Sequence, residues 1–255
     1  MKFYESHTNL TAELWTEYCA NAVKTKPSAA RLLANLGILS TKSEGPPDHV
    51  VRHMEAAYGH AMSATPLTNL VHGVPLTDDA VLHLSKFHKA GQLLHAVVGI
   101  STEIVEARRW STWGELIKEL GDLSWYSAIA TCALLEPGES MESHFDNARS
   151  SASLEPGLPA VLERFEKAVG LSKKLAFYGR SDLKTAVLQL IAEGLVLMDE
   201  FVSSSSGVSC AHMAELLAIN SRKLLGARYA SGSFSNEQAK ERADVVDKTK
   251  DDDKA

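Results

Sequence analysis

Residues 93–129 read LLHAVVGISTEIVEARRWSTWGELIKELGDLSWYSAI. Apolar residues recur every three or four positions on both sides of a short polar break at Ser111 and Thr112. This spacing is typical of helices that bury one face, and Ser111 and Thr112 can cap the start of the second helix. The stretch therefore predicts two helices, over about 77–110 and 112–135, that fold back on each other as an antiparallel pair.

Helical spacing of apolar residues extends over most of the chain, and two-residue alternation is scarce. The sequence therefore predicts an all-α fold with about nine helices, separated internally by a linker over 150–159. Besides the pair above, we expect helices over 11–23, 28–36, 46–63, 160–177, 182–202, 209–229 and 236–246.

The composition excludes several classes of protein. The 255 residues are 45% hydrophobic and 23% charged, which is typical of a globular chain with a substantial core. A net charge of −6 argues against a broad basic face for nucleic acid, so we expect no nucleic-acid partner. The three cysteines are not spaced as metal ligands usually are. The first residues lack the apolar run of a signal peptide. No apolar run is long enough to cross a membrane. These features predict a cytoplasmic protein with no membrane partner.

Four acidic residues stand out in the predicted helix pair. Glu103 and Glu106 lie on the first helix, and Glu119 and Asp122 lie on the second, three residues apart in each case. Three residues is about one helical turn, so each pair shares a helix face. On a helical wheel Glu119 falls roughly 40° from Leu123, inside the apolar face, and Glu103 falls at the edge of the apolar face of its own helix.

Carboxylates on apolar faces are costly to bury unless they are protonated, paired or bound to a cation. A divalent cation with oxygen ligands relieves the repulsion within such a group, and Mg²⁺ combines carboxylates with water and phosphate oxygens. The sequence therefore predicts a site for metal and phosphate. Twenty glutamates also produce pairs at this spacing by chance, and most such pairs lie on solvated helix faces. Two successive pairs on apolar faces favour the metal site.

The two acidic segments resemble a known family. Glu103-x-x-Glu106, followed by Glu119-Leu120-Gly121-Asp122-Leu123-Ser124-Trp125-Tyr126, is similar to the signature of the MazG-like all-α nucleoside triphosphate pyrophosphatases. That superfamily also holds the dimeric dUTPases and the phosphoribosyl-ATP pyrophosphohydrolases. The resemblance implies a phage-type member with Mg²⁺, or alternatively Mn²⁺, held by Glu103, Glu106, Glu119 and Asp122, which would also be the catalytic residues.

A second block near the C-terminus resembles the segment with which the family binds phosphates. Its members are Asn220, Lys223, Arg228, Tyr229 and Arg242. Lysine and arginine suit a polyphosphate chemically, and the alternative is a basic helix end that complements the helix dipole. Two further residues, His95 and Trp110, are candidates for contact with the nucleobase.

About a hundred residues separate the two blocks, more than is usual in the family, and they read like a second, degenerate copy. Glu163-x-x-Glu166 stands where the first acidic pair would fall, but the second pair projects onto Leu190 and Glu193. We therefore expect a helical extension over 1–75, MazG-like catalytic helices over 76–150, a degenerate MazG-like half over 151–247 that supplies the phosphate-binding segment, and a charged, disordered tail over 248–255.

The resemblance implies hydrolysis of a nucleoside triphosphate to the monophosphate and pyrophosphate, in the control of nucleotide pools. It also implies at least a homodimer, located in the host cytoplasm if a phage encodes the chain. Two alternatives stay open. One is the same fold acting on phosphoribosyl-ATP or an alarmone. The other is a non-catalytic helical interaction protein whose acidic face serves a partner.

Overall fold

The computed structural model describes residues 9–24, 78–151, 157–205 and 212–228, and over these residues the fold is all-α. The chain divides into two compact units, one formed by residues 1–26 and 93–255 and the other by residues 27–92. The described part of the second unit is the first half of one long helix. None of the described helices is both long and apolar enough to cross a membrane.

Helices make up most of the described part of the chain. In chain order they are α2 (Ala12–Lys24), α6 (Asp78–Ala107), α7 (Trp113–Leu134), α8 (Glu142–Ser150), α9 (Leu158–Tyr178), the single 3₁₀ turn η2 (Ser181–Leu183), α10 (Lys184–Ser204), α11 (Met213–Ser221) and the π-helical turn η3 (Arg222–Arg228).

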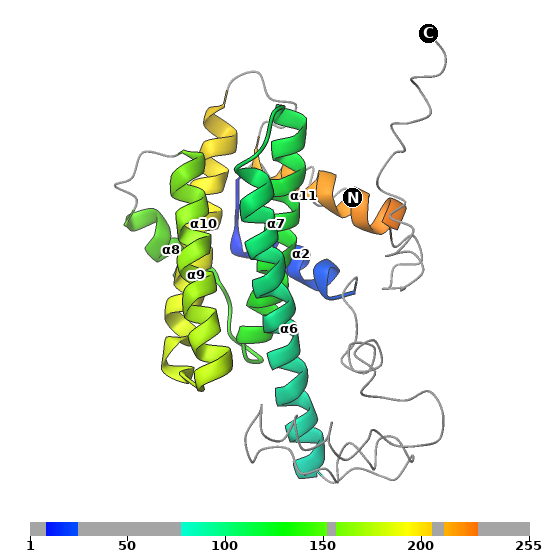
Figure 1. The fold of residues 1–255 in the computed structure, drawn as a ribbon, viewed down its shortest axis with the longest axis vertical. Helices are drawn as coiled ribbons and strands as arrows, with labels where there is room; N and C mark the ends of the chain where they lie inside the picture. The colour runs from blue at the N-terminus through cyan, green and yellow to red at the C-terminus, as the bar shows by residue number, and fades with distance from the viewer. Residues whose placement is uncertain (1–8, 25–77, 152–156, 206–211, 229–255) are drawn as a thin grey trace. The chain divides into compact units, whose positions relative to one another are not determined.

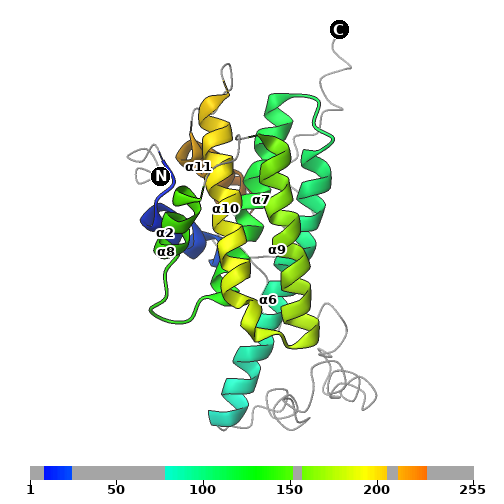
Figure 2. The ribbon, with the colours of Figure 1, turned by 90° about the vertical axis from the view of Figure 1, so that its left-hand side faces the viewer.

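Two helix pairs form the body of the first unit (Figure 1). The second half of α6 runs beside α7, and α9 runs beside α10 (Figure 2). The shorter helices cover this body, with α2 and α11 against α7 and α8 against α10. The described part of this unit is therefore a helix bundle, as the apolar spacing predicts.

Local sequence signals set the ends of these helices. Thr112 caps α7, because its side chain accepts from the backbone of Glu115 while the Glu115 side chain accepts from the backbone of Thr112. Pro159 stands in the first turn of α9, where its missing N–H costs nothing. Gly179 ends the same helix in the left-handed conformation, with φ of 65°.

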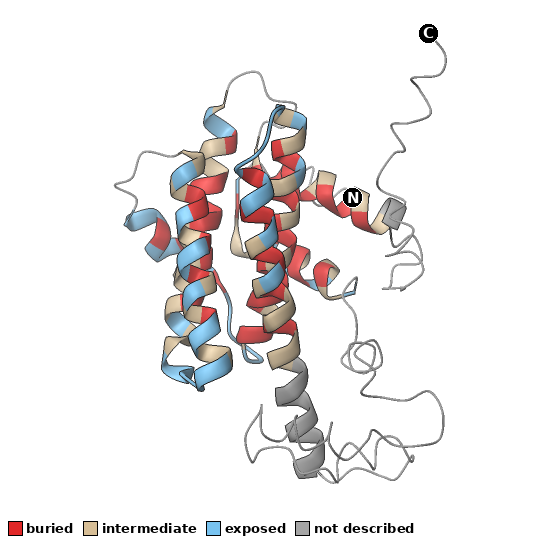
Figure 3. Cartoon of the chain, viewed as in Figure 1, coloured by how far each residue is buried: buried red, intermediate tan, exposed pale blue. Residues whose placement is uncertain are grey.

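The core lies between the helices, whose buried residues face one another (Figure 3). The apolar stripe predicted for α7 is fully buried, and the stripe predicted for α6 is buried except for half-buried Val97. The residues concerned are Leu116, Leu120, Leu123 and Ile129 on α7, and Leu93, Val97, Ile100 and Ile104 on α6.

The structure departs from the predicted helices in two places. Helix α8 was not predicted, because only Phe145 and Ala148 of its nine residues are buried and its apolar signal is correspondingly weak. The predicted helix over 209–229 begins later, at Met213, and continues from Ser221 into a π-helical turn. The helices predicted over 28–36, 46–63 and 236–246, and the charged tail over 248–255, lie outside the described residues.

Close packing between α6 and α7 depends on Gly99. A Cβ added there would lie 2.2 Å from a ring carbon of Tyr126, so the missing side chain is what lets this ring pack against α6. The Tyr126 ring also meets the rings of His95, 5.5 Å away, and Trp125, 4.8 Å away. This contact fixes the approach of the two helices that carry the acidic residues.

We predict that Gly99→Ala lowers the free energy of unfolding by roughly 1–3 kcal/mol, because the Tyr126 ring must move. The matched control is Gly170→Ala on α9, where an added Cβ meets nothing within 4 Å. That change should raise the free energy of unfolding by roughly 0.5–1 kcal/mol through helix propensity alone. Urea unfolding of both variants measures the difference, and a Gly99→Ala variant as stable as the wild type would contradict this packing.

Candidate metal centre

Three carboxylates of the predicted group meet where α6 runs beside α7. Glu103 and Glu106 extend from α6 and Glu119 from α7, and one carboxylate oxygen of each lies within 4.8 Å of the other two. Within the described part of the chain, this is the one group of three or more acidic, histidine or cysteine side chains close enough to share a metal ion.

Glu103 is the most enclosed of the three, at 9% exposed. Burial, as the largest cause, together with the negative charges of Asp122, Glu106 and Glu119 and a hydrogen bond with Glu119, raises the pKa of this carboxyl to about 8. Near neutral pH and without a cation, Glu103 therefore holds a proton. The helical wheel placed Glu103 only at the edge of its apolar face, and contact with α7 accounts for the additional burial.

Glu119 is half-buried, and burial is also the largest cause that raises its pKa. Its hydrogen bond with Glu103 has opposite effects on the two partners, raising the pKa of Glu103 and lowering that of Glu119. A protonated Glu103 that donates to an ionised Glu119 produces this pattern. The two carboxyl groups thus share one proton in the cation-free chain.

The donor set fits a hard divalent cation. No lysine, arginine or histidine in the described residues forms an ion pair with Glu103, Glu106 or Glu119. Carboxylate oxygens are the ligands that Mg²⁺ and Mn²⁺ accept, and Glu106 is exposed, which leaves the cluster open to water and substrate.

The fourth predicted acid has a different partner. Asp122 lies one turn beyond Glu119 on α7, and its Oδ2 accepts from Nζ of Lys223 at 2.5 Å. Both side chains are largely enclosed, with 18% of Asp122 and 20% of Lys223 exposed. The structure thus brings a residue from the predicted phosphate-binding block directly against the acidic helix.

Asn220 joins the same two helices one turn earlier. Its amide nitrogen donates to the backbone carbonyl of Gly121 and to the hydroxyl of Tyr18, both at 2.8 Å. An added Cβ at Gly121 would lie 3.1 Å from the Asn220 Cβ, so the glycine between Leu120 and Asp122 allows this close approach. The arrangement positions α11 and Lys223 against α7, and it makes the role of Asn220 in this structure one of packing.

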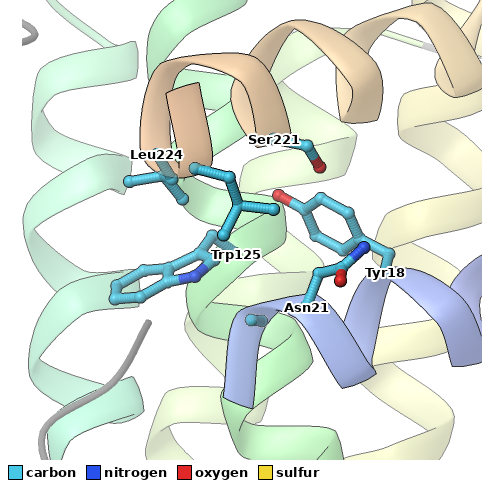
Figure 4. Close-up of a pocket in the computed structure, with 7 residues that line it drawn as sticks. Tyr18, Asn21, Trp125, Ser221 and Leu224 are labelled. Atoms are coloured by element: carbon cyan, nitrogen blue, oxygen red, sulfur yellow. The ribbon is translucent and has the colours of Figure 1, made fainter. Parts of the chain in front are cut away.

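Tyr18 was not identified from the sequence. It lies on α2, is 1% exposed, and also donates its hydroxyl hydrogen to the Gly121 carbonyl at 3.4 Å. Beside it is a small pocket that Asn21, Trp125, Ser221 and Leu224 also line (Figure 4). Its volume of about 10 Å³ holds about one water molecule, far less than a nucleobase needs.

The remaining predicted residues are only partly placed. Trp110 lies in the connection from α6 to α7, 38% exposed and 5.4 Å from the ring of Trp113. His95 packs edge-on against Trp125 and Tyr126 within the bundle. Arg228 ends the turn η3 but its side chain is outside the described residues, as are Tyr229 and Arg242.

Three acids of the second helix pair are partnered by cations. Glu163 pairs with Lys167 at 2.7 Å, Glu166 with Arg108 at 2.7 Å, and Glu193 with Arg164 at 2.9 Å. These ion pairs neutralise the three carboxylates. The contrast with the acids of α6 and α7 shows that Glu-x-x-Glu spacing by itself does not leave negative charge for a metal.

Comparison of the chain with family models, with characterised proteins and with solved structures finds no match.

The raised pKa of Glu103 has a consequence for stability. Between about pH 4.5 and 8 the folded chain keeps a proton on Glu103 that the unfolded chain loses, so without a divalent cation stability falls as pH rises through this interval. We predict that Glu103→Gln removes this decline and stabilises the cation-free protein at pH 8 by on the order of 1 kcal/mol. Thermal unfolding in EDTA across the interval measures the effect. An unchanged pH slope in the variant would contradict the assignment of this proton to Glu103.

Proposed function

We propose that this protein is a Mg²⁺-dependent nucleoside triphosphate pyrophosphohydrolase of the MazG-like all-α type. The observation that carries the proposal is the group of three carboxylates from α6 and α7, within 4.8 Å of one another and without a cation partner in the described residues. Water would add across the bond between the α- and β-phosphates of a (d)NTP, giving (d)NMP and pyrophosphate.

In this proposal Glu103, Glu106 and Glu119 hold Mg²⁺, or alternatively Mn²⁺, and Asp122 is the fourth acid of the site. Such an ion lowers the pKa of a water molecule and neutralises charge on the triphosphate. Glu103 would give up its proton to hold such an ion, because a carboxyl group is a good metal ligand only when it is ionised. One carboxylate of the group would also accept a hydrogen bond from the attacking water and orient it.

The cationic side of the site is proposed to come from the C-terminal block. Lys223 supports this role because its ammonium group already lies at the acidic helix, 2.5 Å from Asp122. Lysine binds phosphate as a point charge, and Arg228 and Arg242 would grip phosphate oxygens in pairs. Asn220 would hold α11 in place and Tyr229 would contact the substrate.

Trp110 and His95 are the candidates for recognition of the base. Exposed Trp110 offers a ring for stacking at the end of α6, whereas His95 would have to leave its contacts with Trp125 and Tyr126 to meet a base. The preferred nucleotide is left to experiment, with dUTP, dCTP and dGTP all as candidates. We further propose control of nucleotide pools in the cytoplasm, or in the host cytoplasm for a phage enzyme, by a homodimer or larger homo-oligomer.

We predict that the protein releases pyrophosphate from at least one member of a panel of NTPs and dNTPs, and only when Mg²⁺ or Mn²⁺ is present. Glu119→Gln should lower kcat at least ~100-fold, because the loss of one carboxylate removes several kcal/mol of charge stabilisation by the ion. Separate assays for phosphate and pyrophosphate identify which bond breaks.

Glu163→Gln is the matched control, since Glu163 has the same spacing on α9 but is exposed and paired with Lys167. Its activity should equal that of the wild type. If the folded wild type releases neither pyrophosphate nor phosphate from any nucleotide of the panel, with phosphoribosyl-ATP and alarmones included, the proposed reaction is contradicted. A binding protein would then be favoured. Turnover of one of those two substrates alone would favour the related reaction in the same fold.

A further inference from the structure

The ion pair between Lys223 and Asp122 occupies one of the four acids proposed for the metal. Nζ of Lys223 lies 2.5 Å from Oδ2 of Asp122, and about four-fifths of each side chain is enclosed. The other three acids have no such partner in the described residues, although Asp122 is close enough to raise the pKa of Glu103 by its charge. Among the described residues, Asp122 is thus the one acid of the group that pairs with a cation.

The segment that holds Lys223 has an unusual backbone. Helix α11 ends at Ser221 and the chain continues as the π-helical turn η3, whose second residue is Lys223. π-helical turns are rare and occur mostly at functional sites. In contrast, the residue one turn earlier, Asn220, is fixed by hydrogen bonds to Tyr18 and Gly121. Lys223 thus lies just beyond the end of α11, in a π-helical turn that follows a helix held against α7.

We propose that Lys223 is an internal counter-cation that keeps Asp122 out of the metal's ligand set until a triphosphate draws the ammonium group away. This inference rests on the proposed function. A lysine ammonium paired with Asp122 competes with a divalent ion for the same carboxylate, because two positive charges this close together repel each other. A polyphosphate presents more negative charge to the lysine than one carboxylate does. Substrate binding would therefore complete the site by exchanging the partner of Lys223.

Binding of Mn²⁺ alone to the full chain without nucleotide, followed by calorimetry or by electron paramagnetic resonance, tests this role. Lys223→Met should bind Mn²⁺ about tenfold or more tightly than the wild type, because Asp122 becomes available as a ligand. Adding Asp122→Asn to that variant should return the affinity close to that of the wild type. Lys223→Arg, which keeps the charge, should behave like the wild type, and circular dichroism checks that each variant folds.

Nucleotide affinity provides the readout that a merely structural lysine would not give. With Mg²⁺ at saturation, a non-hydrolysable triphosphate analogue should bind about tenfold or more weakly to Lys223→Met, opposite in direction to the change for Mn²⁺. Arg164→Met is the matched control, because the Arg164–Glu193 pair is equally enclosed, with 19% and 23% exposed, and belongs to the second helix pair. It should change neither affinity.

Two results would overturn the inference while leaving the proposed function in place. One is a wild type that binds Mn²⁺ through Glu119, shown by loss in Glu119→Gln, with no gain in Lys223→Met. The other is a loss of both affinities in Lys223→Met, which would make the lysine structural. Failure of the wild type and of Lys223→Met to bind any Mn²⁺ would overturn the proposed function and the inference with it.

Discussion

The mutual repulsion of carboxylates in a helix interface is the constraint on which the rest of this structure depends. The apolar stripes of α6 and α7 are buried in the bundle, and the Tyr126 ring fills the space over Gly99. The two helices therefore cannot separate to reduce the repulsion between their carboxylates. Burial makes each ionised carboxylate costly, and proximity makes the group costlier still. A proton on Glu103 and the ammonium group of Lys223 on Asp122 each remove one negative charge. A divalent cation would relieve the same repulsion with more charge, and this supports the metal site that we propose.

The second helix pair shows how a similar acidic pattern becomes ordinary structure. Along α9 and α10, the carboxylates Glu163, Glu166 and Glu193 each meet a lysine or arginine within 2.9 Å. One of those partners is Arg108, which follows Glu106 by two residues but forms its ion pair with Glu166. The placement of basic side chains therefore distinguishes a structural pair of acids from one that retains its charge.

Much of this arrangement could be predicted from the sequence because it is local. The all-α class, the pair α6–α7, the cap at Thr112 and the apolar stripes all follow from spacing along one helix, and the convergence of Glu103, Glu106 and Glu119 needs only a tight connection between two such helices. Contacts between distant segments could not be read this way. Tyr18 meets Asn220 across 202 positions of the chain, and nothing in the spacing of α2 distinguishes this tyrosine from a core aromatic residue. The pairing of Asp122 with Lys223 across 101 positions is similar, since the sequence indicated an acidic block and a basic block but not which members touch.

The central claim is that Glu103, Glu106 and Glu119 form one cation site. The most direct test is the anomalous scattering of Mn²⁺ in crystals of the full chain grown at pH 7.5, with Mg²⁺ competition as a check on the ion. We expect a single strong anomalous peak between α6 and α7, within bonding distance of a carboxylate oxygen from each of the three glutamates. A crystal that shows the three side chains still hydrogen-bonded to one another, with Mn²⁺ absent or bound elsewhere, would contradict it.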